Sequence, residues 1–266
     1  MTQTTYTLND LSIGYRAQGT DKVLARHLNA RLPEGRLTCL LARNGAGKST
    51  LLRTMAGFIP SLDGQVVLAD KPLSSYSPKE IAKTIGVVLT DKIHCGNLTA
   101  FELVAMGRLP YSGFLGGLTA ADRDIVKKAI EMVGMSSFVK RKISELSDGE
   151  LQKLVIAKTL AQQTAVVLLD EPLAFLDFNS KISMMQLLRH LAHDCNKTVL
   201  LSIHDLEIAL QAADNLWVLT PDGSLEQGVP SELSLSGSLD FFFKDESVSF
   251  DRSTMQYSFN NNIEES

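Results

Sequence analysis

A glycine-rich segment, ARNGAGKST at residues 42–50, has the residue types of a phosphate-binding loop. It follows the apolar run TCLLA and leads into LLRTMAGF, which has helical character. In such a loop, small residues let backbone N–H groups close around phosphate oxygens, and the positive end of the next helix points at them. Lys48 would neutralise the β- and γ-phosphates, and the Ser49 hydroxyl would ligate Mg²⁺. The alternative, a glycine-rich turn before a helix, explains less of this strand, loop and helix context.

The residues expected to bind nucleotide are therefore those of the loop and the start of its helix: Asn44, Gly45, Ala46, Gly47, Lys48, Ser49 and Thr50. One position departs from the usual pattern, because Ala42 stands where the first glycine is expected. Alanine is accommodated only if its φ is negative. We expect binding to survive, since Gly45 and Gly47 stand where the backbone must approach the phosphates most closely.

A pair of carboxylates follows the apolar run VVLL in VVLLDEP, residues 166–172. Asp170 would lie near the Mg²⁺, and Glu171, one step beyond, could polarise an attacking water. An ordinary exit from a strand into a loop would give the same pattern. The phosphate loop earlier in the chain favours the functional interpretation.

Two further segments have both a functional and a structural interpretation. In SELSDGELQKLVIAKTLA, residues 144–161, Ser147 and Gly149 could offer a hydroxyl and N–H groups to a phosphate at a helix N-terminus. Ser147 with Glu150 would equally form a capping box. His204, after the run TVLLSI, could be an ordinary buried histidine, although ligand sites of α/β proteins lie at this end of a strand.

The elements that must position these residues are short apolar runs that alternate with longer helical patterns. TCLLA (38–42), IGVVL (85–89), VVLLD (166–170) and TVLLSI (198–203) are typical of buried parallel strands, so an α/β core is predicted. Residues 97–145 carry helical spacing without a strand, which indicates a helical subdomain inserted in a domain spanning 1–235. Residues 236–266 are rich in Ser, Phe and Asn and form a tail of unknown role, expected to pack through its phenylalanines and to fray at NNN.

Composition limits the possible partners. With 26 basic and 30 acidic residues, the formal charge of −4 gives no drive toward nucleic acid. The three scattered cysteines indicate a reducing compartment, and the N-terminus has no secretory pattern, so we expect the chain to stay inside the cell. No apolar run has the length of a membrane helix. A membrane process would need another chain to cross the bilayer.

In order along the chain, ARNGAGKST, LSDGE, VVLLDEP, AFLD and SIHD resemble the Walker A, signature, Walker B, D-loop and H-loop motifs of ABC ATPases. The resemblance covers roughly residues 6–232 and implies a P-loop NTPase (RecA-like) core with an N-terminal antiparallel β part and the inserted helical signature subdomain. Tyr15 in LSIGY looks like the aromatic residue that stacks on adenine.

The resemblance also implies ATP and Mg²⁺ as cofactors and a head-to-tail dimer with a second ATPase subunit. ATP bound by Lys48 and Ser49 of one subunit would be closed over by the signature of the other: Ser147, Asp148, Gly149 and Glu150. Glu171 would be the general base or the carboxylate that orients water. His204 would hold the γ-phosphate, and Asp177 would link the two sites.

Residues 97–119 resemble the segment that follows the Q-loop in importers of iron siderophores, haem and vitamin B12. This implies a peripheral subunit at the cytoplasmic face of the cell membrane, with permease subunits docked near residues 90–115 and, indirectly, a substrate-binding protein. Two further departures are Thr90 at the position of the Q-loop glutamine, where Asp91 could take part, and Asp148 in place of the second signature glycine, whose side chain we expect to turn away from the phosphate.

Other interpretations remain open. A soluble ABC ATPase that remodels nucleic acid or ribosomes would usually carry two cassettes or a coiled-coil insertion, neither of which is visible here. An ABC exporter ATPase would carry the same motifs, and only the resemblance of residues 97–119 to importers favours import over export. A small-molecule kinase would share the phosphate loop but not LSDGE, DEP and His204. His190 and His193 could bind a metal on one helix face, although two solvated histidines explain them as well.

Overall fold

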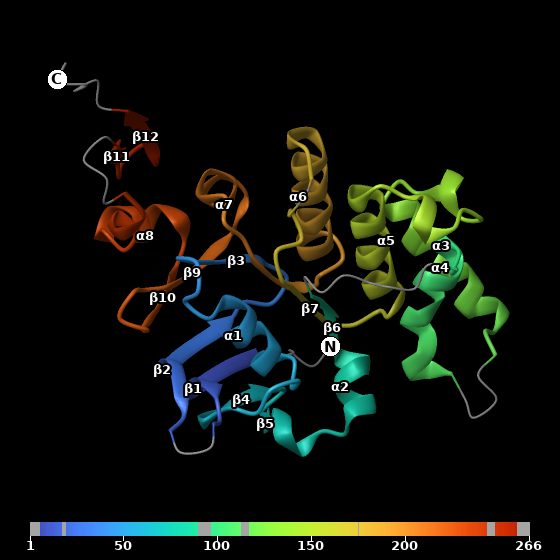
Figure 1. Ribbon diagram of the computed structural model, residues 1–266, viewed down its shortest axis with the longest axis horizontal. Coiled ribbons are helices and arrows are strands. Elements are labelled where there is room, and N and C mark those ends of the chain that lie inside the picture. Colours follow the sequence, from blue (N-terminus) through green and yellow to red (C-terminus); the bar gives the residue numbers. More distant parts are fainter. Residues whose placement is uncertain are drawn as a thin grey trace.

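The helix that follows the phosphate loop is enclosed between two β-sheets (Figure 1). The computed structural model describes residues 6–17, 20–89, 97–112, 117–174, 176–243 and 248–259. The enclosed helix is α1 (Lys48–Met55), and its Leu51 and Met55 pack in one hydrophobic core with Leu40 and Trp217 of the larger sheet. The start of α1, where the phosphate loop ends, is thereby held rigidly.

The larger sheet is the predicted parallel core. Its strand order is β10-β9-β3-β8-β7-β6, and all neighbours from β9 to β6 are parallel, whereas β10 is antiparallel. The strands are β3 (Leu37–Ala42), β6 (Ile85–Val88), β7 (Val166–Leu169), β8 (Thr198–Ser202), β9 (Asn215–Leu219) and β10 (Leu225–Gly228). Leu40 and Leu41 face different hydrophobic cores, which explains why the runs are apolar at successive positions. The four predicted strands are confirmed.

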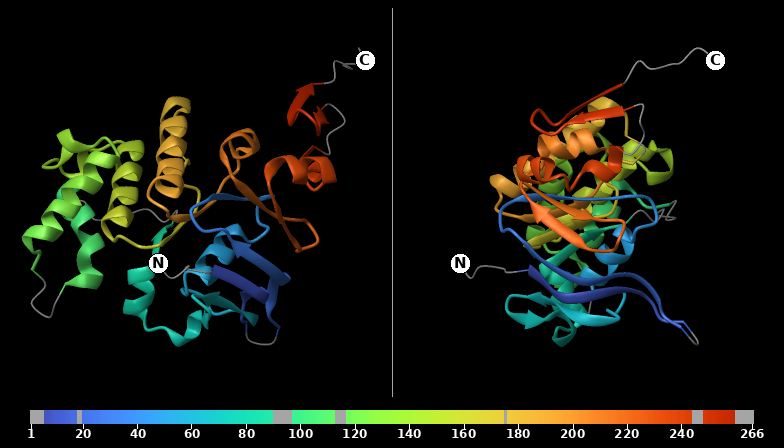
Figure 2. Two further views of the ribbon diagram at one scale, coloured as in Figure 1. Left: turned by 180° about the vertical axis from the view of Figure 1, so that it is seen from behind. Right: turned by 90° about the vertical axis from the view of Figure 1, so that its left-hand side faces the viewer.

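The smaller sheet is antiparallel and lies on the other side of α1 (Figure 2). Its order is β2-β1-β4-β5, built from β1 (Tyr6–Tyr15), β2 (Lys22–Leu32), β4 (Asp63–Leu68) and β5 (Lys71–Pro72). Tyr6 is fully buried, and its hydroxyl donates a hydrogen bond to the carbonyl of Met55 in α1. Strand β1 ends at Tyr15, which lines the same pocket as the phosphate loop. The sheet is the N-terminal antiparallel part that the resemblance implies.

The segment between β6 and β7 is largely helical. It contains α3 (Ala100–Ala105), α4 (Ala120–Met132) and α5 (Asp148–Ala161), with the 3₁₀ turns η2 (Met106–Tyr111), η3 (Ser136–Phe138) and η4 (Ile143–Glu145). Each α-helix begins with a capping box: Thr99 with Glu102, Thr119 with Asp122, and Ser147 with Glu150. The helical pattern over 101–109 is partly 3₁₀.

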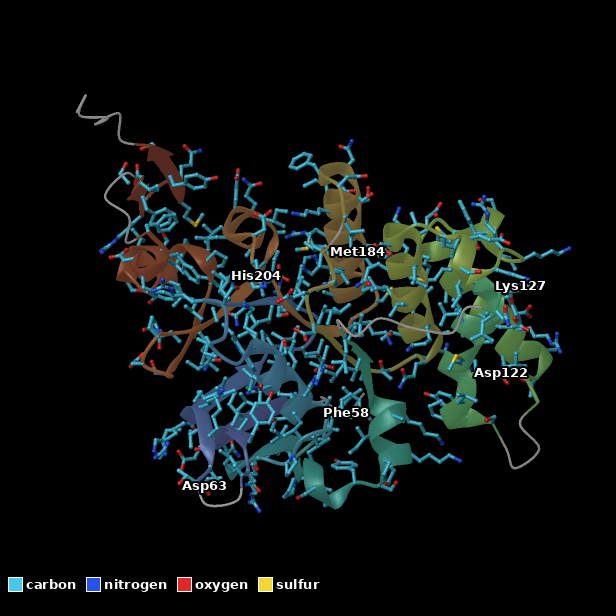
Figure 3. The ribbon with its side chains drawn as sticks, viewed as in Figure 1. Phe58, Asp63, Asp122, Lys127, Met184 and His204 are labelled. Atoms are coloured by element: carbon cyan, nitrogen blue, oxygen red, sulfur yellow. The ribbon has the colours of Figure 1, made fainter. Side chains whose placement is uncertain are left out.

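These helices pack against one another and share one hydrophobic core with the larger sheet. Both α3 and α4 pack against α5. In Figure 3, Asp122 of this helical part and His204 at the end of β8 lie on opposite sides of Met184, a residue of α6 (Phe178–His193). In this view the helical part and His204 are thus on different sides of α6.

The second face of the parallel sheet is covered by α6 and α7 (Leu206–Ala212). The remaining elements are α2 (Pro78–Thr84), the 3₁₀ turn η1 (Leu73–Ser75), α8 (Pro230–Ser236), η5 (Asp240–Phe243) and the hairpin β11 (Val248–Asp251) with β12 (Gln256–Phe259). Phe243 and Phe250 of the tail are stacked with ring centroids 4.2 Å apart, while the NNN stretch lies outside the described residues. No helix in the described ranges combines the length and apolar character of a membrane span.

Candidate functional site

The phosphate loop joins the end of β3 to the start of α1. Gly45 and Gly47 have φ of 79° and 106°, a region that glycine adopts without strain. A side chain at Gly47 would also meet Leu24, whose Cβ would lie 3.3 Å away. Ala42 ends β3 without a positive φ, as its alanine requires. Because Gly47 caps α1 without a side-chain hydrogen bond, the N–H groups of the first turn are left for another acceptor.

The amine of Lys48 lies at the centre of the site. It is buried, donates a hydrogen bond to the Ala42 carbonyl at 3.2 Å, and lies 3.4 Å from Nδ1 of His204. Burial lowers the pKa of Lys48, and the carboxylates of Glu171 and Asp170 oppose that shift. Burial thus removes the amine from water, while the nearby carboxylates favour its charged form, the form that binds phosphate.

Two carboxylates follow β7, and the structure gives them different surroundings. Asp170 is 1% exposed, and one of its oxygens accepts a hydrogen bond from the Ser202 hydroxyl at 2.8 Å. Glu171 has a φ of 50°, which is uncommon for a residue with a Cβ. Its Oε1 lies 2.5 Å from Nε2 of His204. His204 therefore bridges a carboxylate and the Lys48 amine, and it is 46% exposed, so the interpretation as a buried histidine is wrong.

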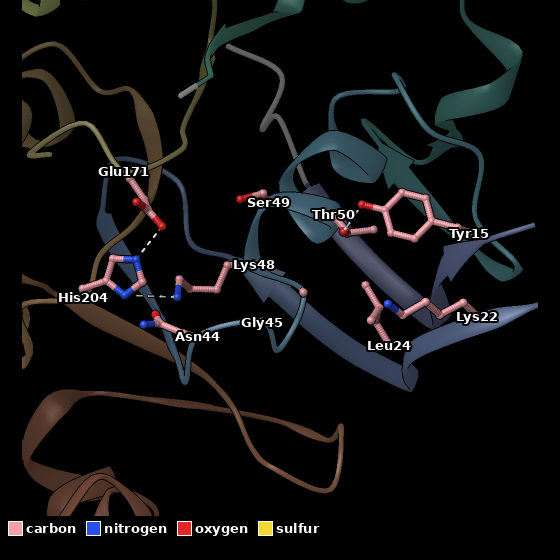
Figure 4. A pocket seen from close by; sticks show the side chains of 11 residues that line it. Tyr15, Lys22, Leu24, Asn44, Gly45, Lys48, Ser49, Thr50, Glu171 and His204 are labelled. Atoms are coloured by element: carbon pink, nitrogen blue, oxygen red, sulfur yellow. Dashed lines mark hydrogen bonds and ion pairs between the residues drawn. The ribbon is translucent and has the colours of Figure 1, made fainter. Parts of the chain in front are cut away.

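Lys48, Glu171 and His204 line one wall of a pocket of about 450 Å³ (Figure 4), whereas Asp170 is not among its lining residues. The other wall holds Tyr15, whose hydroxyl shares a hydrogen bond of 2.8 Å with the Thr50 hydroxyl. The pocket is lined by Tyr15, Lys22, Leu24, Asn44, Gly45, Gly47, Lys48, Ser49, Thr50, Glu171 and His204. It joins an aromatic ring to a phosphate loop, an amine and a carboxylate, which suits a nucleotide with its base at one end and its phosphates at the other.

The signature segment lies elsewhere. Ser147 and Glu150 form the capping box at the start of α5, and the hydrogen bonds from the Ser147 N–H and hydroxyl lower the pKa of Glu150. Neither they nor Asp148 and Gly149 line the pocket. A side chain at Gly149 would lie 3.2 Å from Leu176, in the segment after Glu171. The predicted orientation of the exposed Asp148 carboxylate stays a prediction.

Four other residues singled out from the sequence have outcomes of their own. Asp177 caps α6 by accepting a hydrogen bond of 2.7 Å from the Ser180 N–H, which lowers its pKa. Thr90 lies outside the described residues. His190 and His193 bind different carboxylates, those of Asp194 and Asp214, each at 2.7 Å. Since no group of three possible ligands is found within the described residues, the metal interpretation of these histidines has no support.

Sequence reasoning missed three residues of the site: Lys22, Leu24 and Ser202. Lys22 and Leu24 carry no motif, and only the pairing of β2 with β1 brings them beside Tyr15. Ser202 did have a signal, because it is a polar residue inside the apolar run TVLLSI and comes two positions before His204.

The family model for the ABC transporter domain matches residues 25–174, more than half of the chain. The chain is 38% identical to an uncharacterized ABC transporter ATP-binding protein of Methanocaldococcus jannaschii, over 84% of this chain and 76% of that protein. It is 37% identical to the iron(3+)-hydroxamate import ATP-binding protein of Bacillus subtilis, over 84% and 81%. It is 36% identical to the manganese transport system ATP-binding protein of Listeria monocytogenes, over 91% and 98%.

Among solved structures, the chain superimposes on a dimeric bacterial ABC transporter cassette with a TM-score of 0.75, at 24% identity over 85% of this chain and 98% of the other. That likeness supports the fold. The chain belongs to the ABC transporter family of ATP-binding proteins. It is an ATPase.

Proposed function

We propose that this chain energises the import of a metal chelate, as one half of an ATPase dimer beneath a separate membrane permease. The observation that carries the proposal is the contact series from Lys48 through His204 to Glu171 in a pocket that the chain's own signature segment does not reach. A second copy of the chain would supply the signature segment, because the chain's own segment does not line the pocket. The solved cassette to which the chain is similar is itself described as dimeric.

The residues of the pocket divide the work of hydrolysis. Lys48 binds the β- and γ-phosphates, and Tyr15 stacks on the base. Glu171 orients the attacking water and accepts its proton as the water oxygen bonds to the γ-phosphorus and the bond to the β-phosphate oxygen breaks. His204 lies between the amine and the carboxylate, where the γ-phosphate and the water meet. Asp177, beside the interface, links the two sites of the dimer.

The site has oxygen ligands of the kind that Mg²⁺ prefers, one in the pocket and one outside its lining. The Ser49 hydroxyl lines the pocket, and the Asp170 carboxylate is buried and held by a hydrogen bond. When bound with the nucleotide, the metal neutralises charge on the β- and γ-phosphates. Ser49 and Asp170 would hold it, and Thr90 at the Q-loop position is a further ligand proposed from the sequence.

The proposals for the cargo and for the place in the cell are supported by the names of relatives. The Bacillus subtilis relative is named for iron(3+)-hydroxamate import, so we propose a chelated metal ion as the cargo and the cytoplasmic face of the membrane as the site of action. For the chain itself, we propose that residues 1–235 form the ATPase domain, with 97–145 as its helical subdomain and 236–266 as an added tail. The test measures the uptake of an iron hydroxamate and of manganese in cells with and without the chain. Loss of iron hydroxamate uptake alone would support a chelate cargo, whereas loss of manganese uptake would favour the cargo named for the Listeria relative.

The test of the shared site uses a Glu171→Gln variant, which keeps the shape of the side chain and removes its charge. We expect it to bind ATP without turnover and to sediment as a dimer with ATP and Mg²⁺, but not with ADP. Adding Ser147→Arg should abolish the dimer, because the new side chain fills the place of the partner's γ-phosphate.

Ser137→Arg is the matched control, since Ser137 is another exposed serine of the helical part. It should leave the dimer intact. A monomer under all conditions, or a dimer that survives Ser147→Arg, would contradict the shared site. Hydrolysis by Glu171→Gln at the parent rate would contradict the role of Glu171.

A further inference from the structure

A single buried hydroxyl connects the two carboxylate positions of the site. Ser202 is the last residue of β8 and is 0% exposed. Its Oγ donates a hydrogen bond to Oδ1 of Asp170 at 2.8 Å and accepts one from the backbone N–H of Glu171 at 2.9 Å. The hydroxyl therefore uses its donor on one residue of the pair and an acceptor site on the next.

The hydrogen bond to Glu171 acts where the backbone needs support. Glu171 has a φ of 50°, a conformation that residues with a Cβ adopt only when their surroundings hold them there. The bond from its N–H to Ser202 fixes the peptide that precedes this turn. The direction of that peptide sets the direction of the side chain, whose Oε1 meets Nε2 of His204 at 2.5 Å.

The same serine also ties together the ends of two strands. Asp170 and Glu171 leave β7, and His204 leaves β8 two residues after Ser202. Because β7 and β8 are parallel neighbours, a bond from Ser202 across to Asp170 and Glu171 fixes the two strand ends relative to each other. The contact between Glu171 and His204 depends on that relative position.

A buried hydroxyl in this sheet does not have to serve the site. Thr38 of β3, the other neighbour of β8, is also 0% exposed, and its Oγ1 has no hydrogen-bond partner within the described residues. The sheet therefore tolerates a buried hydroxyl that makes no hydrogen bond within the described residues. Ser202 differs because both of its hydrogen bonds end on residues that belong to the site.

We propose that Ser202 is a positioning residue for ATP hydrolysis: it orients the Asp170 carboxylate toward the metal–nucleotide complex and holds Glu171 against His204. The inference rests on the proposed roles of Asp170 and Glu171. It assigns Ser202 no contact with the nucleotide, so its effect should fall on turnover and on the contribution of Mg²⁺ to binding, rather than on the binding of ATP alone.

The test compares Ser202→Ala with Ser202→Thr, which keeps the hydroxyl, and with Thr38→Val, which removes a buried hydroxyl from the neighbouring strand. We expect Ser202→Ala to lower kcat by about 10- to 100-fold, the usual effect of losing a group that orients a metal ligand. The KM for ATP in Mg²⁺ should rise as well, by at most about tenfold, because the metal then contributes less to binding. Ser202→Thr should recover most of kcat, and Thr38→Val should keep the parent value.

A second measurement needs no turnover. In a Glu171→Gln background, the ratio of the ATP Kd in EDTA to the Kd in Mg²⁺ measures what the metal adds to binding. Ser202→Ala should lower this ratio by about tenfold through the Mg²⁺ value, with the EDTA value unchanged. Thermal unfolding of every variant checks the fold, and Ser202→Cys, close in size but a weak donor, replaces an alanine variant that does not fold.

The inference would be overturned if Ser202→Ala or Ser202→Cys kept the parent kcat and the parent ratio of the ATP Kd in EDTA to the Kd in Mg²⁺. An equal loss of kcat in Thr38→Val would overturn it too, because it would show a general effect on the sheet. The proposed function fails separately. If Glu171→Gln hydrolyses ATP at the parent rate, the roles of the carboxylates are wrong; if Glu171→Gln is inactive while Ser202→Ala is active, only the role of Ser202 is wrong.

Discussion

Replacing Arg108 with methionine should destabilise the helical part of the chain. Arg108 lies in η2 and is 6% exposed. Its Nε donates to the Asp122 carboxylate at 2.8 Å, and its Nη1 donates to the Ala161 carbonyl at 2.8 Å and to the Gln163 side chain at 3.1 Å. The guanidinium also lies 4.1 Å from the ring centroid of Tyr111. One side chain thus joins η2, the start of α4 and the end of α5.

The magnitude follows from the burial of the pair. The side chains of Arg108 and Asp122 are 7% and 15% exposed, so methionine would leave a carboxylate and a carbonyl poorly solvated and without their donor. Removing one partner of a buried ion pair costs about 3–5 kcal/mol, and the partial access of water to Asp122 places the effect near 3 kcal/mol. In a chain of this size, that free energy corresponds to a decrease in Tm of about 6–12 °C.

The assay is urea unfolding followed by far-UV circular dichroism and by the fluorescence of Trp217, the one tryptophan of the sequence. Trp217 is fully buried in the core around α1, so it reports the sheets, whereas circular dichroism includes the helical part. The control is Arg108→Met with Asp122→Asn, which removes both charges and should recover part of the loss. A single variant within about 0.5 kcal/mol of the parent, or strictly additive effects in the double variant, would refute the reasoning.

Two more predictions concern pH and nucleotide binding. Hydrogen bonds from Thr119 and then from Arg108 lower the pKa of Asp122 to about 2. Since the folded-state pKa is below the ordinary 3.8, this carboxylate stabilises the fold fully above about pH 4, and the contribution is lost as pH falls toward 2. The difference in Tm between the parent and Asp122→Asn should therefore be constant from pH 7 to 5 and disappear near pH 2; a difference that grows in acid would contradict this. Tyr15→Ala should weaken ATP binding about tenfold in a fluorescence titration, whereas Tyr15→Phe keeps the stacking ring and should stay near the parent value; equal losses would assign the effect to the hydrogen bond with Thr50.

Local pattern was enough to predict the parallel strands and the phosphate loop. Strands buried on both faces must be apolar at successive positions, and the loop carries its chemistry in consecutive residues. The partly 3₁₀ course of residues 106–111 was not predicted, because Pro110 and the packing of Arg108 interrupt a pattern that has helical spacing. Local propensity gave way there to tertiary contacts.

Contacts between distant residues were the least predictable. Lys48 and His204 are 156 positions apart, and their 3.4 Å approach exists only because β3 and β8 are neighbours in the sheet. No spacing in the sequence indicates that order. Only the family resemblance assigned Ser147 to the partner's nucleotide, and the structure places Ser147 outside the pocket of its own chain.

The left-handed backbone of Glu171 has a consequence for protein engineering. A residue with a Cβ in this conformation costs about 1–2 kcal/mol, which glycine does not incur. Selection for thermal stability alone would therefore favour glycine or asparagine at position 171, and the resulting chain would fold better but lack the carboxylate to which the proposed function assigns the activation of water. Any library screened for stability should hold this residue fixed, because here stability and activity select for different amino acids.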